Sequence, residues 1–165
     1  MKSILYFAMF LTALSLWVSC RPSIKADLND PAEVISTTAY DSTLAAKLGA
    51  DEYGMKQYVL AFLRMGPNRG QDSMKTAQLM RKHLDNITRM ADEGKLAVAG
   101  PFLDEGDIRG IYIFNVTTIE EAKTLTETDP AIKEGRLVME LHPWYGSAAL
   151  MSLNEQHKKI ARKKI

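Results

Sequence analysis

The chain has 165 residues, of which 46% are hydrophobic and 25% are charged, so its composition is that of one ordinary globular domain. Its formal net charge is +1. A nearly neutral chain lacks the strong positive charge of nucleic-acid-binding domains, and we exclude nucleic acid as a partner.

Residues 1–20 have the order of a secretory signal. Lys2 precedes an apolar run from Ile4 to Val18, which Ser19 and Cys20 close. The run is shorter than the roughly 20 residues that span a bilayer, so a cleaved signal is favoured over a retained anchor. The position of Cys20 resembles the lipobox of bacterial lipoproteins, in which the thiol is acylated. We therefore expect an exported protein of the periplasm or cell envelope, with a lipid on Cys20 as its membrane contact.

Residues 21–55 are expected to be a tether, mostly disordered. They carry few large apolar side chains, and such a segment cannot bury enough surface to offset its ordering entropy. A short helix from Asp41 to Leu48, ended by Gly49, is compatible with the pattern.

Residues 56–145 are expected to form the compact domain. Gln57 to Leu63 is apolar at both alternating sets of positions, which predicts a central strand buried on both faces. Asp72 or Ser73 then caps a helix, and Gly94 ends it.

This first helix has an apolar stripe. Met80, Leu84, Ile87 and Ala91 recur at the spacing of a buried helix face. The spacing predicts that His83 lies on the edge of the stripe, where its ring can reach a cleft.

The second half of the domain repeats the order of the first. Lys95–Leu103 and Arg109–Val116 are predicted strands joined by a tight turn, which makes them an antiparallel hairpin. Thr118–Glu121 is a capping box that opens a second helix, and Asp129-Pro130 ends that helix. Arg136–His142 is the last predicted strand.

The order of elements predicts an α+β, ferredoxin-like βαββαβ fold. Right-handed crossovers place both helices on one face of an antiparallel four-stranded sheet. Tyr112 and Phe114 point to one face and Ile111 and Ile113 to the other, so both faces are apolar. We expect a homodimer that packs through the sheet face without helices.

Residues 146–165 are expected to be a basic C-terminal helix or tail. A solvated helix whose cations suit its own C-terminal dipole is favoured. The alternative is a basic face that touches anionic lipid.

His83 and Asp129 are the candidate catalytic residues. If the helix ends meet, the carboxylate fixes the imidazole tautomer, and the other ring nitrogen serves as a general acid or base. The competing interpretation is structural: the histidine bridges two helices, and Asp before Pro is a common helix stop. We expect Glu140 and His142 to point to opposite faces of the last strand and so not to form one site.

Neither a metal nor an organic cofactor is predicted. The three histidines and the single cysteine lack zinc-ligand spacing. Gly66–Gly70 lacks the lysine and hydroxyl of a phosphate-binding loop.

Several short motifs together resemble the YciI-like (YCII-related) family over about residues 56–145. They are His83-Leu84, Gly94-Lys95-Leu96 with Gly100-Pro101, Thr128-Asp129-Pro130 with Gly135, and Pro143-Trp144. The resemblance implies a dimeric ferredoxin-like fold of the dimeric α/β barrel type, related to muconolactone isomerase-type barrels. It also implies an active pair at His83 and Asp129. Gly100 and Pro101 would line the substrate cleft, or else only end a strand.

The resemblance and the signal-like leader, which is not typical of the family domain, together predict a small envelope enzyme without a cofactor. Some family members resemble enzymes that act on hydroxylated or chlorinated aromatic rings, so a small cyclic or aromatic acid is the expected substrate. Isomerisation or elimination suits a lone acid–base pair. The alternatives are a small-ligand-binding module without turnover and a structural dimeric lipoprotein.

The lipid on Cys20 can be tested by metabolic labelling with a fatty acid. Wild-type chain should incorporate the label and Cys20→Ser should not, because only the thiol at that position can be acylated. Equal labelling of the two chains would contradict the lipoprotein interpretation.

Overall fold

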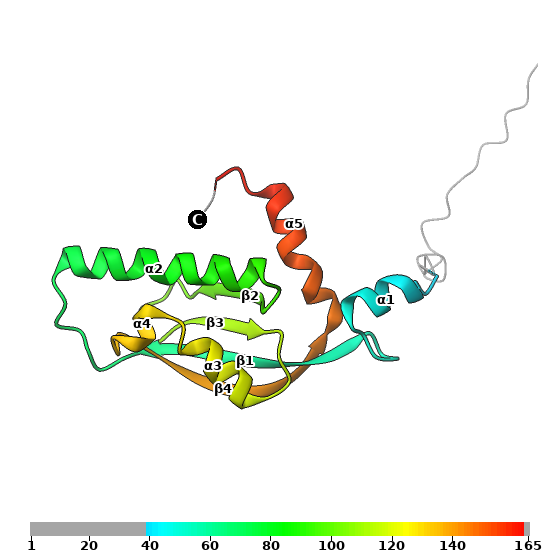
Figure 1. Cartoon of the computed structure of the whole chain (residues 1–165), viewed down its shortest axis with the longest axis horizontal. Helices are drawn as coiled ribbons and strands as arrows, with labels where there is room; N and C mark the ends of the chain where they lie inside the picture. The colour runs from blue at the N-terminus through cyan, green and yellow to red at the C-terminus, as the bar shows by residue number, and fades with distance from the viewer. Residues whose placement is uncertain (1–38, 164–165) are drawn as a thin grey trace, which may run out of the picture. The chain divides into compact units, whose positions relative to one another are not determined.

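A four-stranded antiparallel sheet organises residues 39–163, which the computed structural model describes (Figure 1). The strand order is β2–β3–β1–β4. The strands are β1 (Met55–Met65), β2 (Leu96–Pro101), β3 (Ile108–Phe114) and β4 (Leu137–Ser147). The helices are α1 (Ser42–Leu48), α2 (Ser73–Asp92), α3 (Ile119–Thr126), α4 (Pro130–Lys133), the 3₁₀ turn η1 (Ala148–Ser152) and α5 (Leu153–Ile160). The predicted α+β, ferredoxin-like order is confirmed.

The predicted signal, the predicted lipid site at Cys20 and the predicted tether up to residue 38 lie outside the described residues. Within residues 39–163, no helix combines the length and the apolar character that a membrane crossing needs. The described end of the predicted tether contains α1, which Asp41 caps and Gly49 ends.

The central strand β1 is buried on both sides, as its two apolar sets predict. It pairs with β3 along one edge and with β4 along the other. Val59, Ala61 and Leu63 belong to the core under the helices, and Tyr58 belongs to a second core on the opposite face.

The two helices that join strands within the sheet's core, α2 and α3, begin with side-chain caps. Asp72 accepts a hydrogen bond from the backbone N–H of Lys75 at 2.7 Å, and Thr118 and Glu121 form the predicted capping box. Gly94 follows α2 with a φ of +69°, a conformation that suits glycine better than other residues.

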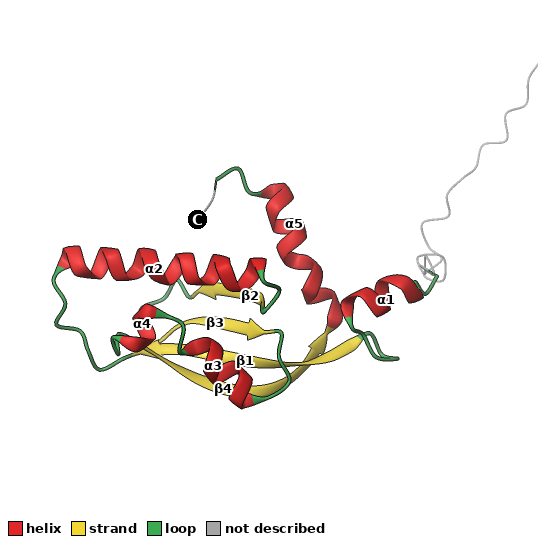
Figure 2. Cartoon of the chain, viewed as in Figure 1, coloured by secondary structure: helices red, strands yellow, loops and turns green. Residues whose placement is uncertain are grey.

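The main core lies between the sheet and α2, α3 and α4. Figure 2 shows α2 lying along the sheet. Burying a large apolar side chain contributes about 1.5–3 kcal/mol, so this layer holds the helices in place. Its large fully buried residues include Val59, Met90, Leu96, Tyr112 and Phe114.

The opposite sheet face is partly covered, which corrects the expectation of a face with nothing over it. Leu150 and Met151 of η1 pack against a cluster of Tyr58, Ala97 and Ile113. The chain after β4 therefore turns back over one end of this face. A second anchor is the amide of Asn154, which donates to the carbonyl of Leu96 at 2.7 Å.

The last strand is longer than predicted. The predicted strand ended at His142, before Pro143, yet β4 continues to Ser147 and Pro143 pairs in register with Val59. The reason is position: β4 is an edge strand, and an edge tolerates a proline whose nitrogen faces solvent.

The expectation for Glu140 and His142 was wrong. Residues two apart on a strand share a face, and Nε2 of His142 lies 3.0 Å from Oε1 of Glu140. Arg64 on β1 completes the cluster, with Nε 2.5 Å from Oε2 of Glu140. The Arg64 guanidinium, and then the His142 ring, lower the pKa of the Glu140 carboxyl.

Candidate functional site

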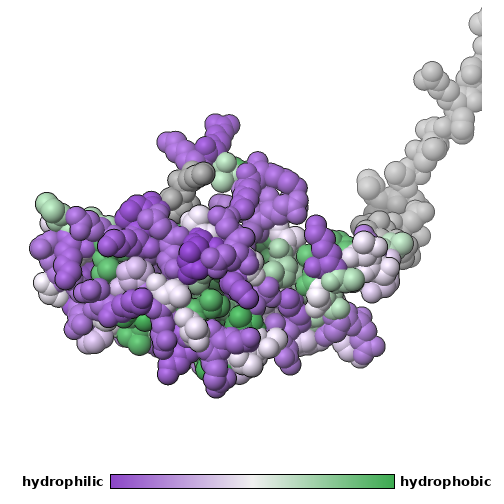
Figure 3. Space-filling view, viewed as in Figure 1, coloured by the Kyte–Doolittle hydropathy of each residue, from purple (hydrophilic) through white to green (hydrophobic). Residues whose placement is uncertain are grey.

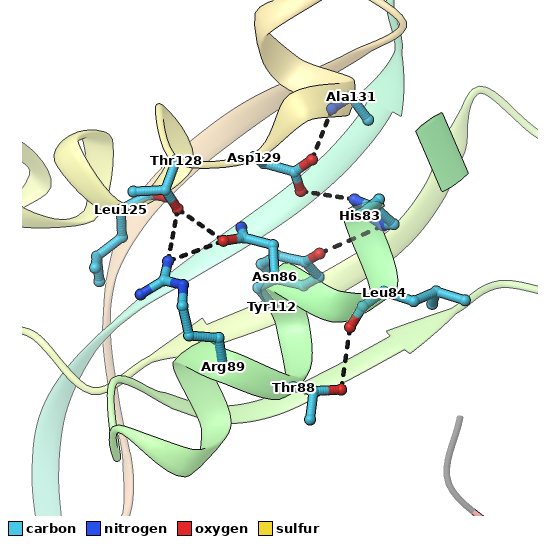
Figure 4. A network of polar contacts seen from close by, with 10 residues as sticks. All are labelled: His83, Leu84, Asn86, Thr88, Arg89, Tyr112, Leu125, Thr128, Asp129 and Ala131. Carbon is cyan, nitrogen blue, oxygen red and sulfur yellow. Dashed lines mark hydrogen bonds and ion pairs between the residues drawn. The ribbon is translucent and has the colours of Figure 1, made fainter. Parts of the chain in front are cut away.

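The side chains of His83 and Asp129 meet in the interior (Figure 4). Nδ1 of His83 lies 2.6 Å from Oδ2 of Asp129, and the two residues are 46 positions apart in the chain. His83 is 5% exposed and Asp129 is 0% exposed. The sequence prediction paired these two residues, and the structure places them in direct contact.

Asp129 holds its position through both carboxylate oxygens. It is the N-cap of α4, and its Oδ1 accepts from the backbone N–H of Ala131 at 2.8 Å. Pro130 at the first helical position fixes the backbone for that turn. The predicted helix stop therefore also begins a new helix, whose cap presents the second oxygen to His83.

His83 lies in the middle of the buried face of α2, and the predicted stripe was one residue out of phase. The buried residues of this helix are Leu79, His83, Asn86 and Met90. Two of these four residues are polar. A search for hydrophobic residues alone therefore finds the apolar residues beside the buried face of α2 and misses its centre. A histidine in the centre of a buried face requires hydrogen-bond partners, which Asp129 and Tyr112 supply.

The contacts determine the tautomer of His83. An ionised carboxylate can only accept, so the Nδ1–H of the ring donates to Asp129. In the neutral imidazole, Nε2 is then an acceptor. Its neighbour is the hydroxyl of Tyr112, 3.5 Å away, a separation at the outer limit of a hydrogen bond. Nε2 is thus the ring nitrogen that the contact with Asp129 leaves able to accept a proton.

Tyr112 forms the floor beneath the imidazole and was not predicted as a site residue. Its ring stacks on that of His83 with 6.3 Å between centroids, and Phe114 contacts it edge-on. Burial, and then the charge of Asp129, raise the pKa of the Tyr112 hydroxyl well above its ordinary value. The group therefore remains a neutral hydroxyl.

Asn86, one turn beyond His83 on α2, joins a second polar network. Its Oδ1 accepts from Nη2 of Arg89 at 2.8 Å and lies 3.1 Å from the hydroxyl of Thr128. Arg89 also donates to that hydroxyl at 3.1 Å. This network ties α2 to the residue that precedes Asp129.

The other amide atom of Asn86 has no partner. Among the described residues, its Nδ2 is the one buried side-chain nitrogen or oxygen without a hydrogen bond. Leaving a buried donor unsatisfied destabilises a fold by about 1–3 kcal/mol. The sequence alone does not single out Asn86 or Tyr112. They would stand out as buried polar residues only if it were already known which positions of α2 and β3 face the core.

Gly100 and Pro101, the predicted cleft residues, close β2 at the edge of the sheet. Pro101 pairs in register with Gly110, and Gly100 with Ile111. No described hydrogen bond or ring contact joins either residue to His83 or Asp129. Their role as cleft residues stays a prediction.

With Nδ1 held by Asp129, the ring of His83 can accept or donate a proton at Nε2. Among residues 39–163, no three histidine, cysteine or carboxylate side chains lie close enough together to hold a metal ion. The His83 side chain is 7% exposed, so it is almost entirely shielded from solvent. A surface hollow is lined by Phe102, Asp104 and Ile108, and neither His83 nor Asp129 lines it.

Comparisons with known proteins support the domain rather than one reaction. The sequence profile of the YCII-related domain matches residues 60–145, just over half of the chain, a range that includes His83 and Asp129. No curated protein is significantly similar to the chain. The matching solved structures include 5-chloro-2-hydroxyhydroquinone dehydrochlorinase (TftG) of Burkholderia phenoliruptrix AC1100, in complex with 2,5-dihydroxybenzoquinone. Its identity to this chain is 22%, the match covers 52% of this chain and 92% of that one, and the TM-score is 0.40.

The stabilising effect of the buried pair can be measured by replacing Asp129. Asp129→Ala should lower the free energy of unfolding by about 3 kcal/mol, because it removes a helix cap and leaves the Nδ1–H of His83 without an acceptor. Urea denaturation followed by circular dichroism measures the loss.

The matched control is Asp72→Ala, which removes the exposed cap of α2 and should lose only about 1 kcal/mol. Equal losses in the two variants would mean that the contact with His83 contributes nothing to stability.

Proposed function

Because the chain belongs to the YCII-related domain family, we propose that it is a small enzyme whose His83, oriented by Asp129, moves a proton on its substrate. The observation that carries the proposal is the 2.6 Å contact between Nδ1 of His83 and the buried carboxylate. A carboxylate at this position stabilises the imidazolium that forms when Nε2 takes a proton.

The expected reaction is an isomerisation or an elimination on a small cyclic or aromatic acid. Both reactions begin with removal of a proton from the substrate and end with its return or with departure of a leaving group. Neither requires a nucleophilic side chain or an organic cofactor. The substrate class rests on the family resemblance.

One observation favours a second candidate. The low exposure of His83 is what a structural bridge between α2 and α4 would show. In that case the chain is a ligand-binding module without turnover, or a structural dimeric lipoprotein.

We also propose a homodimer through the sheet face opposite α2 and α3. Leu60, Phe62 and Ile111 on this face are half-buried, and Val138 is 46% exposed. The cluster of Arg64, Glu140 and His142 lies beside them and carries both signs of charge. Under a two-fold axis, the cation of one copy can face the carboxylate of the other, so the surface is self-complementary.

The side of the molecule drawn in Figure 3 is mostly hydrophilic, with its hydrophobic residues gathered in small separate areas.

The order of residues 1–20 supports export and a lipid anchor on Cys20, which would hold such a dimer at the cell envelope.

Thermal-shift screening of the chain without residues 1–20 tests the enzyme proposal. Lactones and hydroxy-aromatic acids are the panel, because a ligand that binds the native state raises its melting temperature. We expect at least one compound to stabilise both wild type and His83→Gln, and only wild type to convert it. His157→Gln, on the exposed face of α5, is the control and should behave as wild type. Conversion by His83→Gln at the wild-type rate would contradict the proposal.

Sedimentation velocity tests the dimer. The same chain should sediment as a dimer at micromolar concentration, and Phe62→Glu should make it a monomer, because it places a carboxylate in the apolar contact. Met74, whose side chain is exposed on α2, provides the matched control: Met74→Glu should stay dimeric. A wild-type chain that is only monomeric would rule out the dimer.

A further inference from the structure

The buried amide of Asn86 has one end that is fully engaged and one end that is empty. Its Oδ1 accepts from the Arg89 guanidinium and lies within reach of Thr128, and its Nδ2 has no acceptor in the described part of the chain. A guanidinium can only donate, so the oxygen must face Arg89. This contact fixes the orientation of the amide and leaves its N–H groups directed away from Arg89.

The unpartnered donor lies on the same face of α2 as the acid–base atom. His83 and Asn86 are three positions apart, and residues at this spacing on a helix have Cβ atoms about 5–6 Å apart. In Figure 4 the Asn86 amide lies between the contacts of Thr128 and Arg89 on one side and those of His83, Tyr112 and Asp129 on the other. A proton acceptor and a hydrogen-bond donor thus lie about one turn apart on the same buried face of α2.

We propose that Asn86 Nδ2 donates to the substrate oxygen on which negative charge develops when His83 removes the proton. In this step the bond from the substrate to its proton breaks, and the proton moves to Nε2 of His83. The electron pair stays on the substrate as an enolate or phenolate oxygen, which accepts from Asn86. A donor preorganised in a buried site stabilises such an anion more than the neutral ground state. The proposal rests on the proposed proton transfer and assigns its oxygen-binding group.

The assignment explains why this donor has no partner inside the protein. Asn154 shows the usual arrangement, since its side-chain nitrogen donates to the backbone carbonyl of Leu96. Arg89 and Thr128 contact only the oxygen of the Asn86 side chain, so any hydrogen-bond acceptor at position 86 could make these two contacts. The N–H groups of Asn86 have no acceptor among the described residues, so a bound ligand can supply one.

The experiment uses 4-nitrophenol, whose absorbance reports whether its oxygen is ionised. Wild-type chain should bind it as the phenolate. Asn86→Leu should bind it at least tenfold more weakly, because the donor is gone. Its melting temperature should fall as well, because Oδ1, the acceptor of Arg89 and Thr128, is removed with it. Asn86→Asp should also lose the phenolate, since it places an acceptor where the donor was.

Asn154→Leu is the matched control: it should melt at a lower temperature and bind the probe as wild type does, because its donor is already used by the protein. An internal water on Asn86 would leave probe binding unchanged in Asn86→Leu, as in the control, and would overturn the proposal. Binding that needs His83 but is indifferent to Asn86 overturns this assignment alone. No phenolate binding by wild type overturns both this assignment and the proposed proton transfer.

Discussion

The burial of the Asp129 carboxylate is the constraint on which the rest of this structure depends. A fully buried charge is tolerated only when hydrogen bonds surround it, and here one oxygen uses a helix N-terminus and the other uses an imidazole. Satisfying the carboxylate therefore fixes the start of α4, the rotation of α2 about its own axis and the tautomer of His83. The Nε2 atom is left as the one ring nitrogen that can take part in chemistry.

The sequence was sufficient for the fold because its signals are local and agree with each other. The cap at Asp72, the capping box at Thr118 and the apolar run around Val59 each predict one element, and the order of these elements leaves few topologies. The pairing of His83 with Asp129 came from the family resemblance and from the topology, which brings the two helices to one face.

The sequence was insufficient where polar residues occupy buried positions. On α2 the buried face includes His83 and Asn86, so the most hydrophobic stripe is its flank, and the expected phase was one residue out. The strand end at Pro143 was missed for a different reason: whether a proline breaks a strand depends on the neighbour, and the sequence does not show which strand lies at the edge. Both errors concern long-range surroundings rather than local propensity.

The proline in β4 has a consequence for how copies of this protein can meet. An exposed edge strand of 11 residues is a template onto which another chain could add, strand by strand, into a continuous sheet. Pro143 brings no N–H to that row, so the template is interrupted within its length. Pro143, through which β4 continues, therefore hinders the open-ended addition of further chains at this sheet edge.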